Sequence, residues 1–337
     1  MIQNARVLQE DFIPLEVPHR NTELNELHRA LRPIEEEEPG ENTVFISGPS
    51  GVGKTAVTRH MLEDIRTNVL DVNTQYVNCW QDYSRFEVLY EVLSGFSSTV
   101  DIHRRSTPTD ELLNRVENYD GPPYVVVLDE FDQLEDESVL YDLYSVPEIS
   151  MALITNDLVE ELTLLDDRIV SRLRGSRKID MEKYSIDALV DILQKRVEEG
   201  LNGDPVDKFE LEQIADLAAG DARQALAILR LAVREAAMRN LDEIHAEVIE
   251  EVAPEAREEV RDDILDQLKD HQWILYNILD KHGRLDPSEL YDLYHEQVEN
   301  PKTDRTVRNY LQKLVHYKLI VAKGKKRGRT YRVRNSE

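Results

Sequence analysis

The sequence predicts an α/β protein in three parts, and three observations support that prediction. Short apolar runs alternate with helix-compatible stretches to about residue 183, as they do in a parallel sheet whose strands are joined by helices. Residues 184–258 are patterned as helix alone, and residues 259–337 as three helices and two short strands. The charge also changes sign: residues 1–264 hold 26 basic and 57 acidic residues, whereas residues 265–337 hold 15 and 10.

The overall composition is that of a globular protein. Of the 337 residues, 41% are hydrophobic, which is enough for a core and for two or three domains. Cys79 is the one cysteine, so no internal disulfide framework exists. No run comes near the roughly 18 apolar residues that span a bilayer, and the N-terminus MIQNARVLQEDF lacks the apolar stretch of a signal peptide. We therefore expect a cytoplasmic protein that has no membrane partner.

The distribution of charge points to an anionic partner for the C-terminal part. Taken over the whole chain, a net charge of −26 argues against nucleic acid. Between Asn300 and Arg334, however, 12 basic residues stand against a single acid, Asp304. A large acidic body with a basic end predicts an anion-binding tip. The surplus of Asp and Glu over Lys also resembles the composition of proteins from salt-in halophiles.

The predicted strands of the first part are separated by helix-compatible stretches. They are Val44–Ser47, Tyr76–Cys79, Tyr124–Leu128 and Met151–Thr155. The helical part runs from Ser185 to about Val252, with breaks at Gly200, Gly203 and Gly220. The glutamate-rich segment around Pro254 is interpreted as a charged linker or as the start of the next helix.

A glycine-rich loop follows the first predicted strand. The full G-x-x-x-x-G-K-T pattern is matched by Gly48-Pro49-Ser50-Gly51-Val52-Gly53-Lys54-Thr55, and a helix-compatible stretch begins at Ala56. Glycines let backbone N–H groups turn inward around phosphate oxygens, and the N-terminus of the helix adds a favourable potential. We expect Lys54 to reach the β- and γ-phosphates of ATP and the Thr55 hydroxyl to ligate Mg²⁺.

Two acids follow another apolar run, about 75 residues later. Val125-Val126-Val127-Leu128 leads directly into Asp129 and Glu130. We expect Asp129 to hold Mg²⁺, through a water, and Glu130 to polarise the attacking water. Many strands end in a solvated acid, so this pair alone is a weak signal. Joined to the phosphate loop, it predicts a nucleotide hydrolase.

Further segments complete an order of motifs that resembles the AAA+ ATPases and, within them, the archaeal replication-initiator (origin-recognition) family. These segments are Pro14-Leu15-Glu16-Val17-Pro18-His19-Arg20, Tyr76-Val77-Asn78-Cys79, Ile154-Thr155-Asn156 and Gly220-Asp221-Ala222-Arg223-Gln224-Ala225-Leu226. The resemblance implies that Asn156 is the sensor-1 residue and that Arg223, on a lid, contacts the γ-phosphate. It also implies ATP-binding roles beside the adenine for Val17, Pro18, His19 and Arg20.

An arginine finger is also implied by the resemblance, but its identity stays open between two residues. Asp166-Asp167-Arg168-Ile169-Val170-Ser171-Arg172-Leu173 resembles the box that supplies the finger to a neighbouring subunit. The family usually has a proline before the box arginine, where this sequence has Asp167. Ser171-Arg172 matches the wider AAA+ pattern, which favours Arg172 over Arg168. The alternative for both is an ion pair on a helix surface.

The C-terminal part predicts three helices followed by a strand hairpin. The helices are expected at Leu265–Lys281, at Ser288–Gln297 and after Thr303, which is a suitable N-cap. On the third helix an apolar face should meet the core: Val307, Tyr310, Leu311 and Leu314. A second face, about 150° away at roughly 100° per residue, carries residue types that contact base edges and phosphates: Arg305, Arg308, Asn309 and Gln312.

The predicted strands Leu319–Ala322 and Thr330–Val333 flank a glycine-bounded basic hairpin. This hairpin contains Lys325, Lys326, Arg327 and Arg329. A helix followed by a basic hairpin is winged-helix architecture, and its recognition helix would enter the major groove of double-stranded DNA. A solvated basic tail and a protein-docking module are the alternatives. The alternation in the strands counts against the first, and the concentration of cations counts against the second.

The resemblance implies a function as well as a fold. It implies a RecA-like AAA+ core at 1–183, a helical lid at 184–258 and a winged helix at 259–337. It further implies binding of replication-origin DNA, an ATP/ADP state that controls recruitment of the replicative helicase, slow hydrolysis, and association with itself or with paralogous subunits. Two other hypotheses are a DNA motor or clamp loader with sustained turnover, and a transcription regulator whose nucleotide is structural.

Overall fold

The chain forms two compact units, Met1–His245 and Ala246–Glu337. The computed structural model describes residues 2–10, 12–14, 16–35, 43–69, 71–96, 99, 101–104, 106–203, 205–324 and 328–334.

The first unit is built on a parallel sheet. Its order is β2-β3-β4-β1-β5, and every neighbouring pair is parallel. The strands are β1 (Thr43–Ser47), β2 (Asn73–Asn78), β3 (Tyr124–Asp129), β4 (Ile149–Ile154) and β5 (Arg177–Asp180). The predicted α/β class and its four strands are confirmed. The fifth strand was not predicted, because β5 has only four residues and buries one of them, so it shows no apolar run.

Alternate side chains of the central strands enter two different cores. On β3, Val125 and Val127 belong to one buried cluster, whereas Val126 and Leu128 belong to the other. This alternation follows from the pleat of a strand, which sends successive side chains to opposite faces. Because both faces are apolar, helices must cover both.

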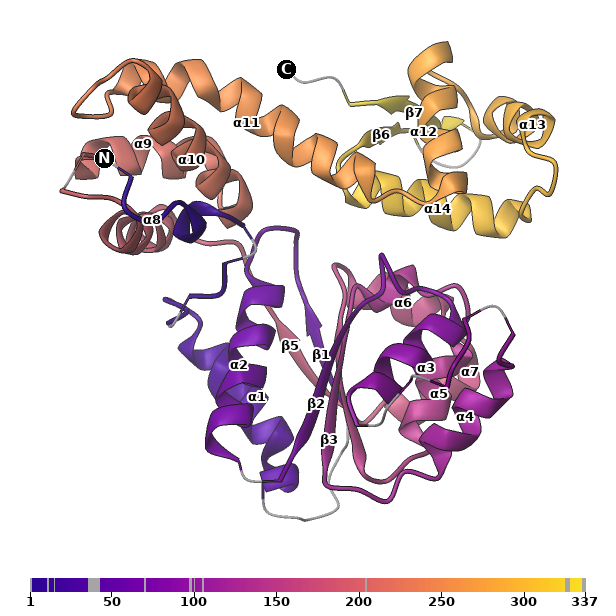
Figure 1. Cartoon of the computed structure of the whole chain (residues 1–337). Coiled ribbons are helices and arrows are strands. Elements are labelled where there is room, and N and C mark those ends of the chain that lie inside the picture. Colours follow the sequence, from indigo (N-terminus) through magenta and orange to yellow (C-terminus); the bar gives the residue numbers. More distant parts are fainter. Residues whose placement is uncertain are drawn as a thin grey trace. The chain divides into compact units, whose positions relative to one another are not determined.

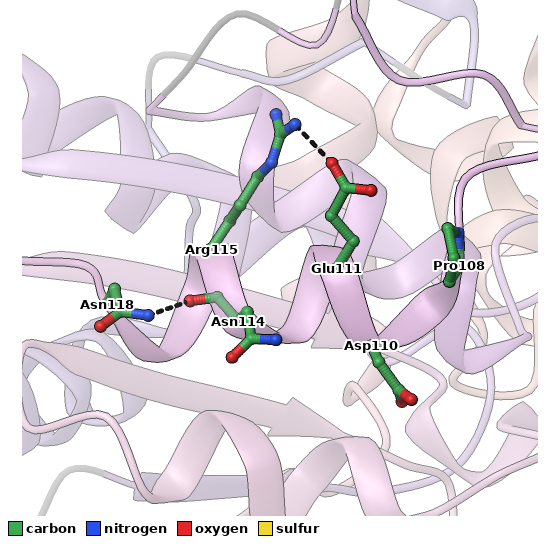
Figure 2. Close-up of a pocket in the computed structure, with 6 residues that line it drawn as sticks. All are labelled: Pro108, Asp110, Glu111, Asn114, Arg115 and Asn118. Carbon is green, nitrogen blue, oxygen red and sulfur yellow. Dashed lines mark hydrogen bonds and ion pairs between the residues drawn. The ribbon is translucent and has the colours of Figure 1, made fainter.

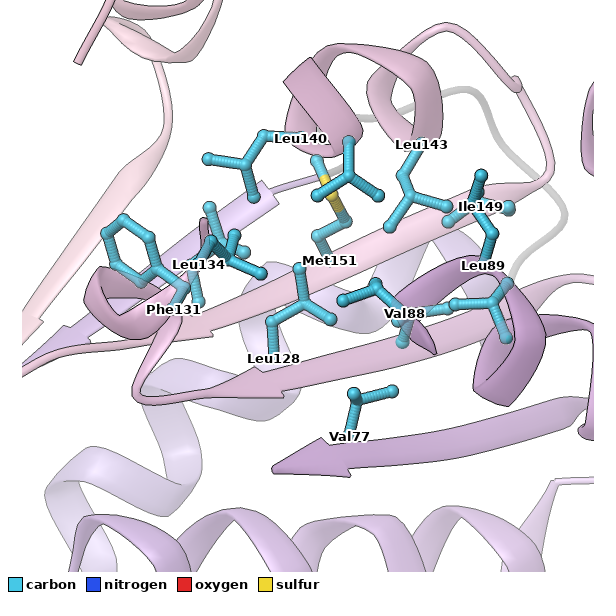
Figure 3. Packing of buried hydrophobic residues seen from close by; sticks show 14 of the residues in the cluster. Val77, Val88, Leu89, Leu128, Phe131, Leu134, Leu140, Leu143, Ile149 and Met151 are labelled. Atoms are coloured by element: carbon cyan, nitrogen blue, oxygen red, sulfur yellow. The ribbon is translucent and has the colours of Figure 1, made fainter. Parts of the chain in front are cut away.

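Two helices cover one face of the sheet and five cover the other (Figure 1). The first group is α1 (Asn21–Glu35) and α2 (Lys54–Asn68). The second is α3 (Arg85–Ser94), α4 (Thr109–Glu117), α5 (Ser138–Tyr144), α6 (Leu158–Leu164) and α7 (Asp167–Leu173). Figure 3 shows how Leu89 of α3 and Leu140 of α5 pack with Leu128 and Met151 of the sheet.

The helical lid follows β5 and packs with the N-terminal segment. It contains α8 (Ile186–Gly200), α9 (Lys208–Ala218) and α10 (Ala222–Met238). The backbone N–H groups of Gln3 and Asn4 both donate to the carbonyl oxygen of Gly200 at 2.9 Å. The short 3-10 helix η1 (Ala5–Leu8) is held as well, since Arg196 donates to the carbonyl oxygen of Val7 at 2.7 Å. The lid is therefore made from two distant parts of the sequence.

The second unit contains four helices and a two-stranded hairpin. They are α11 (Ala246–Asp266), α12 (Asp270–His282), α13 (Pro287–Gln297), α14 (Asp304–His316), β6 (Ile320–Lys323) and β7 (Thr330–Val333), the last two antiparallel. Thr303 caps α14 as expected, since its side chain accepts a hydrogen bond from the Thr306 N–H. The helix predicted at Leu265–Lys281 starts later. Helix α11 continues to Asp266, and the next helix, α12, begins only at Asp270 after a short non-helical stretch.

The interpretation of the Pro254 segment as a linker or a helix start was wrong. Pro254 lies inside α11, eight residues after its first residue. Buried apolar residues continue on both sides of it at helical spacing: Val248, Ile249, Val252, Ala253 and Ala256. This continuous apolar stripe maintains the helix despite a proline, whose cost in a helix interior is about 3 kcal/mol. None of the helices in the described ranges is long and apolar enough to cross a membrane.

We expect Leu89→Ala to lower the free energy of unfolding of the first unit by about 2–5 kcal/mol, because it leaves a cavity in the packed cluster. Leu89 is fully buried, whereas Val159 on α6 is 78% exposed. Val159→Ala is therefore the control, and its effect should stay within about 0.5 kcal/mol. Urea denaturation followed by circular dichroism measures both, and equal effects would contradict this account of the core.

Candidate nucleotide site

The predicted site residues meet at one edge of the sheet. In the strand order, β4 lies between β1 and β3. The phosphate loop follows β1, Asp129 and Glu130 come at the end of β3, and Asn156 follows β4 by two residues. Parallel strands place their carboxyl ends on the same edge, which is where open α/β sheets bind ligands. The strand order therefore places Asn156, which follows β4, between the phosphate loop and the two acids.

Two glycines of the phosphate loop tolerate no larger residue. Gly48 has φ +145°, and a Cβ there would lie 2.2 Å from the carbonyl oxygen of Met181. Gly51 has φ +78°, and a Cβ there would lie 1.9 Å from a carboxylate oxygen of Asp221. The loop thus passes against the end of β5 on one side and against the lid on the other. It continues into α2, which begins at Lys54.

Lys54 is buried within its own loop. Its Nζ donates to the carbonyl oxygens of Gly48 at 2.7 Å and Pro49 at 2.9 Å, and to Asn156 Oδ1 at 2.8 Å. Burial lowers the pKa of the Lys54 ammonium to about 8, although the charges of Asp129 and Glu130 act to raise it. These three acceptors hold the ammonium inside the loop, next to the place where we expect the phosphate oxygens of a nucleotide.

Asp129 accepts two hydrogen bonds on one carboxylate oxygen. Thr55 Oγ1 donates to Asp129 Oδ2 at 2.6 Å, and the Tyr76 hydroxyl donates to the same oxygen at 2.5 Å. Because Thr55 donates its hydroxyl proton to Asp129, the lone pairs of the Thr55 hydroxyl oxygen are left to bind a cation. A hydroxyl and a carboxylate are oxygen ligands of the kind that Mg²⁺ prefers, so this pair fits that ion.

Glu130 is held in an unusual backbone conformation. Its φ of 54° and ψ of 48° are left-handed, which costs a residue with a side chain about 1–2 kcal/mol. The 3-10 helix η2 (Phe131–Gln133) follows it, and the Phe131 ring is buried in the core. Burial, and after it the charges of Asp129 and Asp132, raise the pKa of the Glu130 carboxyl well above its ordinary value. Strain of this kind is typical of functional positions.

Two buried polar atoms at this edge have no hydrogen-bond partner within the described part of the chain. One is the acceptor Oε2 of Glu130, and the other is the donor Nδ2 of Asn156. Buried polar atoms are almost always paired in native proteins. An unpaired acceptor and an unpaired donor at one strand edge are suited to a water and a phosphate oxygen.

The lid contributes a helix N-terminus and a cation to the site. The Ala222 N–H, in the first turn of α10, donates to the carbonyl oxygen of Gly51 at 2.9 Å. Arg223 Nε lies 2.5 Å from Glu10 Oε1. The charge of Arg223 acts on both Lys54 and Glu130, lowering the pKa of each. The Glu10 contact was not anticipated, because it joins residues more than 200 positions apart with no motif between them.

The predicted adenine segment connects the core with the lid. Val17 is buried, Pro18 is half-buried, and His19 Nε2 lies 2.7 Å from Asp191 Oδ2 on α8. Leu15 lies outside the described residues. The ATP-binding role of this segment stays a prediction.

Arg20 is occupied by protein partners. It is only 5% exposed, and it donates to Glu23 and to the carbonyl oxygen of Glu182, both at 2.6 Å. Its guanidinium also stacks over the ring of Tyr184 at 4.1 Å. Because Glu182 and Tyr184 lie between β5 and α8, Arg20 holds the segment that joins the core to the lid.

The two candidate finger arginines lie on α7 and contact residues outside the phosphate loop. Arg168 has a side chain that is 84% exposed, and its Nε lies 3.1 Å from Asp166 Oδ1. Arg172 stacks over the ring of Tyr141 at 4.6 Å and donates to the Tyr141 hydroxyl at 3.3 Å. Arg168 therefore forms the surface ion pair considered above, whereas Arg172 is held by an aromatic ring.

The predicted DNA-contact residues lie in the second unit. On α14, Arg305 and Arg308 are exposed and Asn309 and Gln312 are half-buried, while Val307, Leu311 and Leu314 are buried. Tyr310 is half-buried and stacks on His271. Arg329 lies over the ring of Tyr331 at 5.4 Å. Lys325, Lys326 and Arg327 lie outside the described residues.

A separate hollow of about 480 Å³ opens on the surface along α4 (Figure 2). Its six lining residues are Pro108, Asp110, Glu111, Asn114, Arg115 and Asn118. Arg115 pairs with Asp101 at 2.6 Å and with Glu111 at 2.8 Å, so its charge is compensated by the protein. The hollow shares no residue with the nucleotide site, and none of the motifs places chemistry there.

A parallel sheet with this strand order, a phosphate loop, paired acids and a helical lid define an ATPase of the AAA+ class. Residues 16–154 match the family model of the AAA ATPase domain, and residues 190–254 match the Cdc6 AAA+ ATPase-type lid domain. The chain is 44% identical to ORC1-type DNA replication protein 9 of Halobacterium salinarum, over 98% of its length and 93% of the relative's. The chain belongs to the family of ORC1-type DNA replication proteins.

Other relatives agree with this assignment. Identity to ORC1-type DNA replication protein 1 of the same organism is 47%, over 92% of this chain and all of that one. The Halobacterium relatives also agree with the acidic, halophile-like composition. The structure of the Aeropyrum pernix ORC1 protein in complex with DNA has a TM-score of 0.73 and 26% identity, covering 98% of this chain and 93% of that chain. Aeropyrum pernix ORC2, in ADPNP-ADP complexes, is 22% identical with a TM-score of 0.67 over 99% and 94%, which supports the fold.

We expect Lys54→Ala to abolish ATP binding and Glu130→Gln to keep it while slowing hydrolysis by about 100-fold or more. Lys54 supplies charge for binding, whereas Glu130 acts only on the water. Equilibrium binding of a fluorescent ATP analogue and phosphate release at saturating ATP measure the two steps. Lys178→Ala and Glu117→Gln, both at exposed positions, are the matched controls. Hydrolysis by Glu130→Gln at the parent's rate would refute its role.

Proposed function

We propose that this protein binds ATP with Mg²⁺, hydrolyses it slowly as a switch, and uses that state to control its action on double-stranded replication-origin DNA. The observation that carries the proposal is the combination in one chain of a complete nucleotide site and a basic helix with exposed Arg305 and Arg308. The downstream step is recruitment of the replicative helicase, with assembly alongside identical or paralogous subunits.

The nucleotide step follows from the contacts at the edge of the sheet. Lys54 would exchange its carbonyl acceptors for β- and γ-phosphate oxygens, which carry more charge. Thr55 and Asp129 would hold Mg²⁺, which supplies charge neutralisation between the phosphates. Glu130 would accept a hydrogen bond from the attacking water, and Asn156 Nδ2 would donate to the γ-phosphate.

Arg172 is our proposed finger for a neighbouring subunit's nucleotide. A finger must present its guanidinium in a fixed direction, because misplacement by about 1 Å is costly in catalysis. The ring and the hydroxyl of Tyr141 restrain Arg172 at an exposed position, whereas Arg168 is held by an exposed carboxylate alone. Arg223 would act within its own chain, because the lid carries it toward the phosphate loop.

A winged helix is our interpretation of residues 259–337, with the lid at 184–258 and the AAA+ core at 1–183. Three helices, α12 to α14, precede the antiparallel hairpin β6–β7, which is the order of that architecture. The cationic face of α14 would contact base edges in the major groove, and the basic hairpin would follow the phosphate backbone. This division of roles gives the two surfaces different salt and sequence dependence.

Replacing Lys325, Lys326, Arg327 and Arg329 with Gln should lower the slope of log K against log salt by up to about 3.6 in magnitude. Each neutralised phosphate contributes roughly 0.9 to that slope. Affinity for cognate and scrambled duplexes should fall together. A variant with Gln at four exposed cations of the first unit is the control: Arg174, Arg177, Lys178 and Lys208. An unchanged slope for the hairpin variant would remove the hairpin from the DNA interface.

Arg308→Ala should instead cost about 1–3 kcal/mol on the preferred duplex and little on scrambled DNA, because a base contact carries sequence information. Arg308 is exposed on α14, where it would contact a base, whereas the hairpin cations would contact phosphates, which are the same in every sequence. The same titrations measure it, with Lys318→Ala, two residues past α14 and also exposed, as the control. Equal losses on both duplexes would assign Arg308 to the backbone.

Mixing Arg172→Ala with Lys54→Ala protein should partly restore ATP hydrolysis if the finger acts between subunits. The first variant keeps an intact nucleotide site, and the second keeps an intact finger. Phosphate release from the mixture, compared with the sum of the two variants alone, measures the rescue. Arg168→Ala mixed in the same way is the control, and rescue in that pair but not in the first would transfer the role to Arg168.

A further inference from the structure

The hydroxyl of Tyr76 lies at the predicted cation site. Tyr76 opens the family-like segment Tyr76-Val77-Asn78-Cys79, to which the sequence alone assigns no role. Strand β2 pairs with β3, so that Tyr76 is level with Val127 and Asn78 is level with Asp129. Side chains two residues apart on a strand share a face, which places Tyr76, Val127 and Asp129 on the same face of the sheet. Helix α2, which carries Thr55, packs against that face.

We propose that Tyr76 is a positioning residue for the magnesium site, an inference that rests on the proposed role of Mg²⁺. Its hydroxyl and that of Thr55 both donate to Asp129 Oδ2, at 2.5 Å and 2.6 Å. Two donors on one oxygen stop the carboxylate from rotating and leave Oδ1 without a hydrogen bond from any residue that the structure describes. Asp129 is thereby held in one orientation, with one oxygen kept for the ion and its waters.

The tyrosine is held in place from its other side. Arg59, one helical turn after Thr55 on α2, stacks its guanidinium 4.2 Å from the centre of the Tyr76 ring. The Tyr76 hydroxyl is the donor in its bond to Asp129, because a carboxylate oxygen can only accept. The same helix therefore supplies a direct donor to Asp129 and a cation that holds the second donor.

Hydrogen-bond partners of metal ligands have a measurable effect on the metal. Removing such a partner typically weakens metal affinity or activity by about 10–100-fold, because the ligand loses its orientation. Asp129 retains the Thr55 hydrogen bond when Tyr76 is changed, so we expect the lower end of that range. The nucleotide itself is held by the phosphate loop, and its affinity without Mg²⁺ should not depend on Tyr76.

The test compares Tyr76→Phe with the parent in the full-length protein. The variant keeps the ring and its stacking on Arg59 and removes only the hydroxyl. A fluorescent, non-hydrolysable ATP analogue is titrated in EDTA, and its complex is then titrated with Mg²⁺ at constant ionic strength. We expect the dissociation constant for Mg²⁺ to rise about tenfold in Tyr76→Phe, and the affinity for the analogue in EDTA to stay unchanged.

Tyr124→Phe is the matched control. Tyr124 begins strand β3, is fully buried, and donates its hydroxyl to the carbonyl oxygen of Val92 at 2.5 Å. The Tyr124→Phe variant therefore loses a buried hydrogen bond in the same sheet, and the hydrogen bonds of Asp129 are unchanged. Arg59→Gln is a second variant, and we expect it to raise the Mg²⁺ dissociation constant by about two- to fivefold through the weaker hold on the ring.

Each outcome supports or overturns the inference. A Mg²⁺ dissociation constant for Tyr76→Phe within twofold of the parent's would overturn it, as would an equal loss in Tyr124→Phe, which would indicate a general packing defect. Analogue binding by the parent that does not respond to Mg²⁺ at all would overturn the proposed cation and this inference with it. If analogue binding by the parent responds to Mg²⁺ and Tyr76→Phe has the same Mg²⁺ dissociation constant as the parent, only the role of Tyr76 is overturned.

Discussion

A buried ammonium needs acceptors on every side, and this requirement organises the carboxyl edge of the sheet. Lys54 obtains two acceptors from its own loop and one from Asn156 after β4. Leaving such a charge unpaired in the interior would cost several kcal/mol. The strand order with β4 between β1 and β3 is what makes the third acceptor reachable. Fold and chemistry therefore meet in one side chain.

The balance of charge around this ammonium depends on both the core and the lid. Asp129, Glu130 and Asp132 raise the pKa of Lys54, whereas Arg223 on the lid lowers it. Arg223 is in turn paired with Glu10 of the N-terminal segment. A polyphosphate adds negative charge between these cations, so its arrival changes the electrostatic energy of the core and lid together. The lid helix that contacts Gly51 makes this coupling direct.

Motifs with a local mechanism could be predicted from sequence, and contacts between distant segments could not. The phosphate loop, the acids at the end of β3 and the Thr303 cap depend on spacing within a few residues, and each lies at the strand or helix end where the sequence predicts it. Strand β5 was not predicted because it is exposed along most of its length. The end of the helix predicted near Pro254 was wrong because the apolar stripe across this residue outweighs the helix-breaking tendency of proline. The bonds of Tyr76 with Asp129 and of Glu10 with Arg223 depend on tertiary structure alone.

The docking of residues 2–8 on the lid has a consequence for how the protein reaches its native state. Gln3 and Asn4 bond to Gly200, so this segment meets its partner only after roughly 200 further residues have been made. At about 5–20 residues per second this takes on the order of 10–40 s. During that time the apolar side chains Val7 and Leu8 have no lid to cover them. Their protection during translation falls to chaperones or to transient contacts within the nascent chain.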